Sequence, residues 1–127
     1  MKENNLYKIL RISEWEDASR TGSIVAEVDQ NDGFIHLSTA VQLAATLSFF
    51  FQDSDKVFLL QLDMEKINKN KLIFEEALPN DGLRKSSFPH LYSELSTDQI
   101  SNVWFLERGS FVLPQEVILQ AENPTEN

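Results

Sequence analysis

A nearly continuous apolar segment near the middle of the chain constrains the fold most. Residues 57–63 read Val-Phe-Leu-Leu-Gln-Leu-Asp, a run with the length of a strand rather than of a helix. A strand that is apolar on both faces is typical of the centre of a sheet, so we expect a neighbouring strand on each side. The chain has 127 residues, and half of that length would be short of core, so we expect a single domain. Its core is expected over about residues 5–118, with a disordered polar tail over about 121–127.

Shorter patterns predict the remaining elements. Ser13 and Glu16 form a capping box, which predicts a helix that ends at Gly22. Thr39 is expected to cap a second helix through Phe51, with Leu43, Leu47, Phe50 and Phe51 on its buried side. Further strands are expected at residues 6–12, 34–38, 71–77, 88–92, 100–106 and 110–113, the last two as a hairpin. Pro89 is expected to mark a strand start or an edge. A turn is expected at 29–33, turns or short polar helices at 64–70 and 96–98, and a long mobile loop at 78–87. Early helices followed mostly by strands predict an α+β domain with a mostly antiparallel or mixed sheet.

Composition excludes several classes of function. Acidic residues number 20 and basic residues 11, which gives a formal charge of −9 and disfavours binding to nucleic acid. The chain has no cysteine, so thiol nucleophiles and Cys-ligated metals are absent, and its four glycines are isolated, so no phosphate-binding glycine loop can form. No segment has the roughly 20 apolar residues of a membrane span, and the N-terminus does not resemble a secretory signal. We therefore expect a cytoplasmic protein without a membrane partner.

The only two histidines of the chain lie in matching segments. His36 follows Phe34 by two residues and precedes Ser38 by two. The second segment repeats the spacing, as Phe88-x-His90-x-Tyr92. Because side chains alternate along a strand, each segment presents a phenyl ring, an imidazole and a hydroxyl on one face. The opposite faces are aliphatic, and burying them costs less free energy than burying the polar faces. We therefore expect both polar faces to line a cleft.

The chemistry of these side chains predicts a small-ligand site. Imidazole exchanges protons near working pH, which makes His36 and His90 the candidate catalytic residues. Glu75 ends a strand before the mobile loop and is the nearest candidate for a catalytic carboxylate, while Arg84 in that loop is placed to close over an anion. The other candidate ligand-binding residues are Lys8, Phe34, Ser38, Thr39, Gln42, Thr46 and Tyr92. No spacing of metal ligands is found, so no metal is expected.

Each candidate also has a purely structural interpretation. Either histidine can be a hydrogen-bonded core residue, and Glu75 can be an ordinary surface carboxylate. Lys8 and Arg84 can be salt-bridge partners in so acidic a chain. The polar line of Thr39, Gln42 and Thr46 can be a solvated helix face. The sequence thus leaves three hypotheses open: an enzyme, a non-catalytic binding module, and a structural or interaction domain with both histidines in its core.

Four blocks of sequence resemble a known family. These are residues 7–9, 32–39 (Asp-Gly-Phe-Ile-His-Leu-Ser-Thr), 57–63 and 88–92, which occur in that order within residues 5–114. They are similar to the blocks of the domain of unknown function 952 family, whose members have no assigned reaction. The resemblance implies a fold like that of ADP-ribosyltransferases, in which two small sheets with two or three flanking helices form a cleft that holds NAD.

The resemblance also implies roles for single residues. His36, Ser38 and Thr39 match the first histidine block, His90 and Tyr92 match the second, and Gln42 and Thr46 match helix positions of the pattern. The wider transferase superfamily uses Arg or His on its first strand, Ser or Tyr later, and a catalytic Glu; here the first strand carries Lys8 and the late block carries His90. The expected ligand is a nucleotide such as NAD or a phosphorylated sugar, and the expected reaction, for an enzyme, is glycosyl transfer from it.

Overall fold

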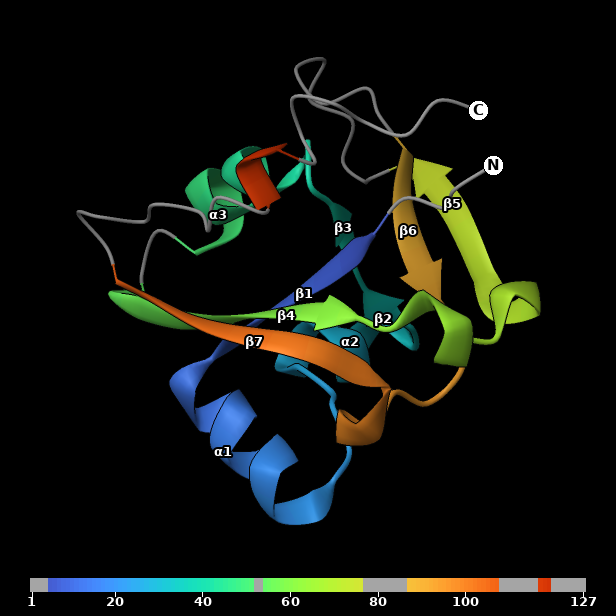
Figure 1. Cartoon of the computed structure of the whole chain (residues 1–127), viewed down its shortest axis with the longest axis horizontal. Coiled ribbons are helices and arrows are strands. Elements are labelled where there is room, and N and C mark those ends of the chain that lie inside the picture. The colour runs from blue at the N-terminus through green and yellow to red at the C-terminus, as the bar shows by residue number, and fades with distance from the viewer. Residues whose placement is uncertain (1–4, 52–53, 77–86, 108–116, 120–127) are drawn as a thin grey trace.

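A computed structural model describes residues 5–51, 54–76, 87–107 and 117–119 (Figure 1). The chain forms two antiparallel sheets with helices around them, which confirms the α+β class. Several expectations lie outside the described residues: the loop at 78–87 with Arg84, except for Ser87, the strand at 110–113 with its hairpin turn, and the tail from 121. Within the described part of the chain, no helix is long and apolar enough to cross a membrane.

The larger sheet has four strands in the order β3-β1-β4-β7. Strand β4 (Lys56–Leu62) pairs on one side with β1 (Leu6–Arg11) and on the other with β7 (Ile100–Glu107). The short strand β3 (Ser38–Thr39) pairs with the start of β1. The prediction that the apolar segment is central is therefore confirmed.

The smaller sheet has the order β2-β6-β5, with β6 (Ser87–Leu91) between β2 (Ile35–His36) and β5 (Leu72–Glu76). Pro89 was expected to mark a strand start or an edge, and this is wrong, because it lies inside the central strand. The carbonyl of Pro89 accepts a hydrogen bond from Leu37 N at 3.0 Å. Proline has no N–H and cannot donate a ladder hydrogen bond. Because β2 ends beside Pro89, no such bond is needed there, and the sheet tolerates the proline.

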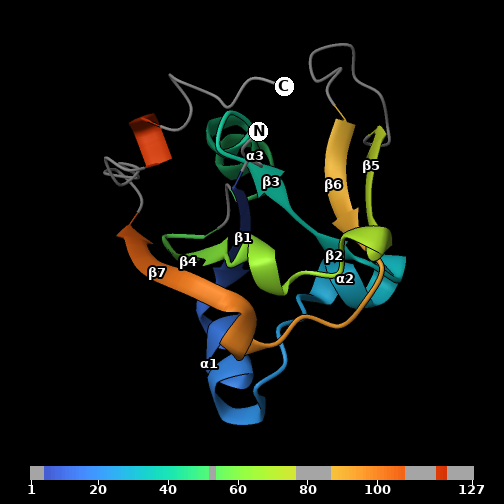
Figure 2. The same cartoon turned by 45° about the vertical axis from the view of Figure 1, so that its right-hand side comes forward.

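The segment at 34–38 was expected to be one strand, but it divides between the two sheets. Residues 35–36 form β2 and residues 38–39 form β3, with Leu37 between them. Figure 2 shows this stretch crossing from one sheet to the other. The two sheets are thus linked within residues 34–38, the segment that contains His36.

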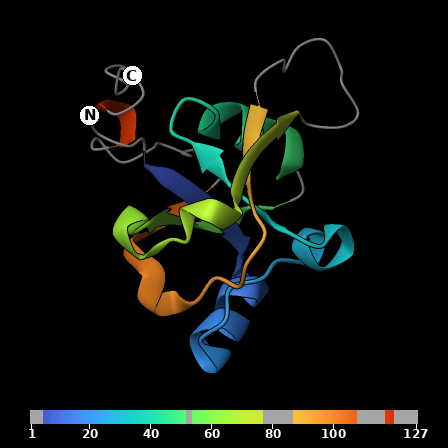
Figure 3. The same ribbon diagram turned by 90° about the vertical axis from the view of Figure 1, so that its right-hand side faces the viewer.

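Both long helices are present, but their starts differ from the prediction. Helix α1 (Ile12–Thr21) begins before Ser13, and Glu14 rather than Glu16 caps it by accepting a hydrogen bond from Arg11 N at 2.8 Å. Its end at Gly22, where φ is 83°, is confirmed. Helix α3 (Leu43–Phe50) starts after a turn, because Thr39 already belongs to β3. Figures 1 and 2, and the side view in Figure 3, place α1 and α3 at opposite ends of the molecule.

Residues 29–33 were expected to form a turn, and this is wrong. They belong mostly to a short helix, α2 (Glu27–Asp32), which ends at Gly33 with φ of 86°. The carboxylate of Asp29 accepts a hydrogen bond from Ala26 N at 2.8 Å and so satisfies a backbone donor that a helix start leaves free. Short 3₁₀ helices, η1 (Met64–Lys66), η2 (Lys69–Lys71) and η3 (Thr97–Gln99), occupy the other predicted polar turns.

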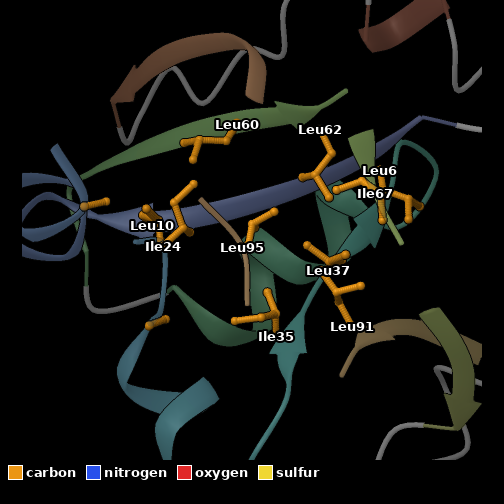
Figure 4. Close-up of a cluster of buried hydrophobic side chains, with 12 residues drawn as sticks. Leu6, Leu10, Ile24, Ile35, Leu37, Leu60, Leu62, Ile67, Leu91 and Leu95 are labelled. Carbon is orange, nitrogen blue, oxygen red and sulfur yellow. The ribbon is translucent and has the colours of Figure 1, made fainter. Parts of the chain in front are cut away.

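Two apolar clusters pack on opposite faces of the larger sheet. One lies between the two sheets and is shown in Figure 4; it includes Leu6, Leu10, Leu60, Leu62, Ile35, Leu37 and Leu91. The other packs α3 against the sheet through Leu43, Leu47 and Phe51, which confirms three of the four residues expected on the buried side of that helix. The aliphatic faces of both histidine strands are buried as expected, and this leaves their polar faces for the site.

Candidate functional site

A cleft of about 600 Å³ is lined by residues from both sheets, and both imidazoles are in its wall. Strands β2 and β6 pair so that His36 lies directly opposite His90, with 5.3 Å between the ring centroids. The expectation that two distant segments bring their imidazoles to the same cleft is confirmed. Six more of the predicted residues line the cleft: Lys8, Phe34, Ser38, Thr46, Glu75 and Tyr92.

Phe34 forms the aromatic centre of this wall. Its ring stacks on His90 at a centroid distance of 4.1 Å and lies 4.6 Å from the ring of His36 and 5.1 Å from that of Tyr92. Rings at these distances and tilts stabilise one another. The four rings therefore form one packed group whose orientation is set before any ligand arrives.

Glu75 joins the second histidine block. Its Oε1 lies 2.6 Å from Nδ1 of His90 and accepts a hydrogen bond from the Tyr92 hydroxyl at 2.8 Å. The carboxylate reaches His90 because β5 pairs with β6, where Glu75 lies opposite Phe88 and Ile73 opposite His90. The Glu75 side chain is 40% exposed, whereas that of His90 is 9% exposed. The carboxylate thus lies at the mouth of the cleft and the imidazole inside it.

These contacts shift two pKa values in opposite directions. The hydrogen bond from His90, followed by that from Tyr92, holds the pKa of Glu75 below its usual value. The same carboxylate raises the pKa of the Tyr92 hydroxyl. Glu75 is therefore ionised at neutral pH. In the tautomer of His90 that donates from Nδ1 to this carboxylate, Nε2 is the acceptor nitrogen. Among the described residues, no hydrogen-bond partner is found for that nitrogen.

A second carboxylate, Asp29, holds His36 from inside the protein. Its Oδ1 accepts hydrogen bonds from His36 N at 2.9 Å and Lys8 Nζ at 3.0 Å, and lies 2.8 Å from His36 Nδ1. Its Oδ2 lies 2.8 Å from Lys8 Nζ and also accepts the bond from Ala26 N described above. The Lys8 ammonium donates a further bond to the carbonyl of His36 at 3.0 Å. The Lys8 and Asp29 side chains are 3% and 1% exposed, so this ion pair is buried.

Burial and pairing act against each other in this ion pair. Burial lowers the pKa of Lys8, while the adjacent Asp29 charge opposes that shift. Burial would raise the pKa of Asp29, but the hydrogen bond from His36 and the Lys8 charge together bring it below its usual value. Lys8 was predicted to contact a ligand, and the structure directs its ammonium to Asp29 and His36 instead.

The remaining nitrogen of His36 faces a third carboxylate. Nε2 lies 2.9 Å from Oδ2 of Asp32, whose side chain is 45% exposed at the end of α2. Both nitrogens of His36 therefore face carboxylate oxygens, and both can donate only in the imidazolium form. His36 is fully engaged within the protein, in contrast to His90.

The predicted polar line on the second helix separates into two groups. Thr46 reaches the cleft, where its hydroxyl lies 3.1 Å from that of Ser38. Thr39 and Gln42 do not line the cleft: the Gln42 amide accepts a hydrogen bond from Thr39 N at 3.0 Å and donates to Ser87 O at 2.8 Å. Thr39 was predicted to bind a ligand, and its backbone amide is instead taken by a side chain of its own segment.

Three residues of the site were not predicted from the sequence. Asp29 and Asp32 hold His36, and Arg11 lines the far part of the cleft with its guanidinium 4.6 Å from the centre of the Phe51 ring. The spacing of Asp32 and His36, four residues apart, was a usable local signal. Asp29 had none, because its other ionic partner, Lys8, lies 21 residues away. The described residues contain no group of three or more potential ligands arranged to hold a metal ion.

Comparison with known proteins then places the chain. Residues 9–103 match the family described as "Protein of unknown function (DUF952)". The chain belongs to DUF952. The match extends from β1 into β7 and contains both histidine blocks, so the resemblance drawn from the four sequence blocks is confirmed. No protein with a curated description matches.

Solved structures of protein CC0527 from Caulobacter crescentus are similar to this DUF952 chain. Its crystal structure is 31% identical over 81% of this chain and 86% of that one, with a TM-score of 0.70. A solution NMR structure of CC0527 gives a TM-score of 0.67, again at 31% identity over 81% of this chain and 84% of that one. Their descriptions name no activity, and they do not support the expected likeness to ADP-ribosyltransferases.

Proposed function

We propose that the cleft is an active site that binds a small ligand with a flat ring and hydroxyl groups, such as the nucleotide NAD, and transfers a glycosyl group from it. One observation carries this proposal: Glu75 holds both His90 Nδ1 and the Tyr92 hydroxyl at the mouth of the cleft. A carboxylate that orients an imidazole is the usual arrangement of a general base. In this proposal Glu75 supplies the carboxylate that the transferase resemblance implies, and it comes from a strand outside both histidine blocks.

In this proposal His90 accepts the proton of the attacking group. A water or hydroxyl oxygen attacks the anomeric carbon of the ribose attached to nicotinamide, its proton passes to Nε2 of His90, and the carbon–nitrogen bond breaks to release nicotinamide. The negative charge of Glu75 stabilises both the imidazolium and the positive charge that develops on the ribose. Each part of the step uses a group whose position is set by β5 and β6.

Size and lining support a ligand of this class. A volume of about 600 Å³ is in the usual range for small-molecule and cofactor sites. Phe34 and Tyr92 offer ring faces, and Ser38 and Thr46 offer hydroxyls. Two small sheets around a cleft that contains a glutamate also fit the fold of ADP-ribosyltransferases, and we include that likeness in the proposal.

One observation favours a second function, a binding module without turnover. Both nitrogens of His36 already face carboxylates, so only one of the two candidate catalytic histidines, His90, has a nitrogen available for proton exchange. In that case the same ligands bind and are recovered unchanged.

The experiment combines calorimetry with chromatography. Wild-type protein is titrated with NAD and with ADP-ribose at millimolar concentration, and free nicotinamide is measured after long incubation. We expect heat of binding and release of nicotinamide. His90→Gln keeps a donor for Glu75 but lacks the base, and should lower the rate by about 10²- to 10⁴-fold while binding changes little.

Two variants sharpen the result. Glu75→Gln should lower the rate as His90→Gln does, whereas Glu65→Gln, which removes an exposed carboxylate from η1 outside the cleft, should not. Binding without nicotinamide release supports the binding module. If neither NAD nor ADP-ribose gives heat of binding to protein that is shown to be folded, both functions are contradicted.

A further inference from the structure

The two aspartates that hold His36 differ in how firmly they are fixed. Asp29 is buried and accepts hydrogen bonds on both oxygens from Lys8, Ala26 and His36. Asp32 is 45% exposed, and within the described residues His36 is its only side-chain partner. Asp32 is also the last residue of α2, directly before Gly33. The contact between Asp32 and His36 is therefore the one that can open without exposing a buried charge.

The geometry of His36 leaves a place for an anion at this point of the cleft. The Asp29 carboxylate is occupied by Lys8, by Ala26 N and by Nδ1 of His36. On the other side of the ring, Nε2 faces the Asp32 carboxylate at 2.9 Å. If Asp32 moves away, an N–H at this position is a donor without an acceptor, which a ligand anion can satisfy.

We propose that the Asp32 carboxylate occupies the place of an anionic group of the ligand, so that the cleft takes ligands whose phosphate or carboxylate displaces Asp32 from Nε2 of His36. This inference rests on the proposed function in one respect, namely that the ligand binds in the same cleft. In addition, the ligand carries an anionic group, and Nε2 of His36 binds that group. Asp32 thereby acts as an internal competitor, and only ligands with a suitably placed anion bind well.

The probe is inorganic phosphate, with acetate in a parallel titration to separate phosphate from carboxylate recognition. Binding is followed through the ¹⁵N signals of both histidines by NMR. We expect phosphate to shift Nε2 of His36 and Asp32→Asn to tighten binding by about fivefold, because the substitution removes the competing ion pair. Asp17→Asn removes the same charge from an exposed position on α1 and should leave the affinity unchanged.

Further variants separate displacement of Asp32 from a general gain in affinity for anions. Adding His36→Gln to Asp32→Asn should abolish the gain, whereas adding His90→Gln should preserve it. Equal phosphate affinity in wild type and Asp32→Asn, or an equal gain in Asp17→Asn, would overturn the inference. The single variant Asp32→Asn gives a further test. If phosphate shifts the signals of His90 but not those of His36 in this variant, the inference is overturned.

The result is independent of turnover. If phosphate binds at His36 and no nicotinamide is released, the proposed enzyme is wrong and the anion site stands. If His90-dependent release of nicotinamide is found without an effect of Asp32→Asn on phosphate binding, the enzyme stands and the anion site is wrong.

Discussion

Each of the two histidines pairs with a carboxylate, but in one pair the carboxylate is buried and in the other pair the imidazole is buried. Asp29 is buried and binds a lysine, a backbone amide and His36, whose own side chain is 30% exposed. Glu75 is exposed, and its partner His90 is the buried member. The same two chemical groups, joined through Nδ1 in both pairs, thus form a structural ion-pair network in one case and an oriented base in the other. Burial of the carboxylate decides between them, because a buried charge must be fully paired.

The largest effect that tests this comparison is on stability. Asp29→Asn leaves the buried Lys8 ammonium without its counter-charge, and should lower the free energy of unfolding by about 3–5 kcal/mol. Glu75→Gln leaves no buried charge behind, so its urea midpoint should stay close to that of Glu65→Gln. The measurement is urea unfolding followed by fluorescence of Trp15 and Trp104.

A double variant serves as the control for this prediction. Lys8→Met combined with Asp29→Asn should cost clearly less than the sum of the two single substitutions, because the lone buried charge is removed as well. If Glu75→Gln destabilises as much as Asp29→Asn does, the distinction between the two pairs is wrong.

The next effect concerns pH. The pKa of Asp29 lies below its ordinary value of 3.8 in the folded protein, so the unfolded chain binds more protons in the window below that value. The stabilisation by the Asp29 carboxylate is therefore fully present above pH 3.8 and is lost as the pH falls through the folded pKa. We expect the stability difference between wild type and Asp29→Asn to shrink in this window, measured by urea unfolding at a series of pH values. A difference that stays constant below pH 3.8 would contradict the role of the ionised carboxylate.

The smallest effect is on the pKa of Glu75 itself. His90→Leu should raise that pKa toward its ordinary value of 4.5, and Tyr92→Phe should raise it less, because the bond from His90 is the larger cause of the shift. Carboxyl ¹³C shifts in an NMR titration give both values. The reverse order would show that Tyr92, rather than His90, is the main partner of Glu75.

Patterns within single segments predicted much of the fold correctly. The apolar run at 57–63 is the central strand, and Gly22 ends α1. The alternation in the two histidine blocks correctly predicts that both imidazoles face the cleft and that Ile35 and Leu91 pack in the core. These features depend on the period of a strand or on one residue's backbone preference, which neighbouring residues are sufficient to reveal.

The errors occur where a contact from another segment changes the outcome. Residues 29–33 have turn composition, yet they lie mostly in a helix whose start is capped by Asp29, and that aspartate is held in turn by Lys8 of β1. Pro89 has the local character of an edge residue and lies in a central strand, because the partner strand ends beside it. Neither partner lies within the segment that was being interpreted.

The sequence by itself determined that two imidazoles, each two residues after a phenylalanine, lie on the polar faces of short strands in a small acidic α+β domain. Only the tertiary structure decided which carboxylate each imidazole meets: Asp29 and Asp32 for His36, and Glu75 for His90. The physical reason is range. The direction of a side chain along a strand follows from local backbone geometry, whereas hydrogen bonds and burial depend on which distant segments pack together.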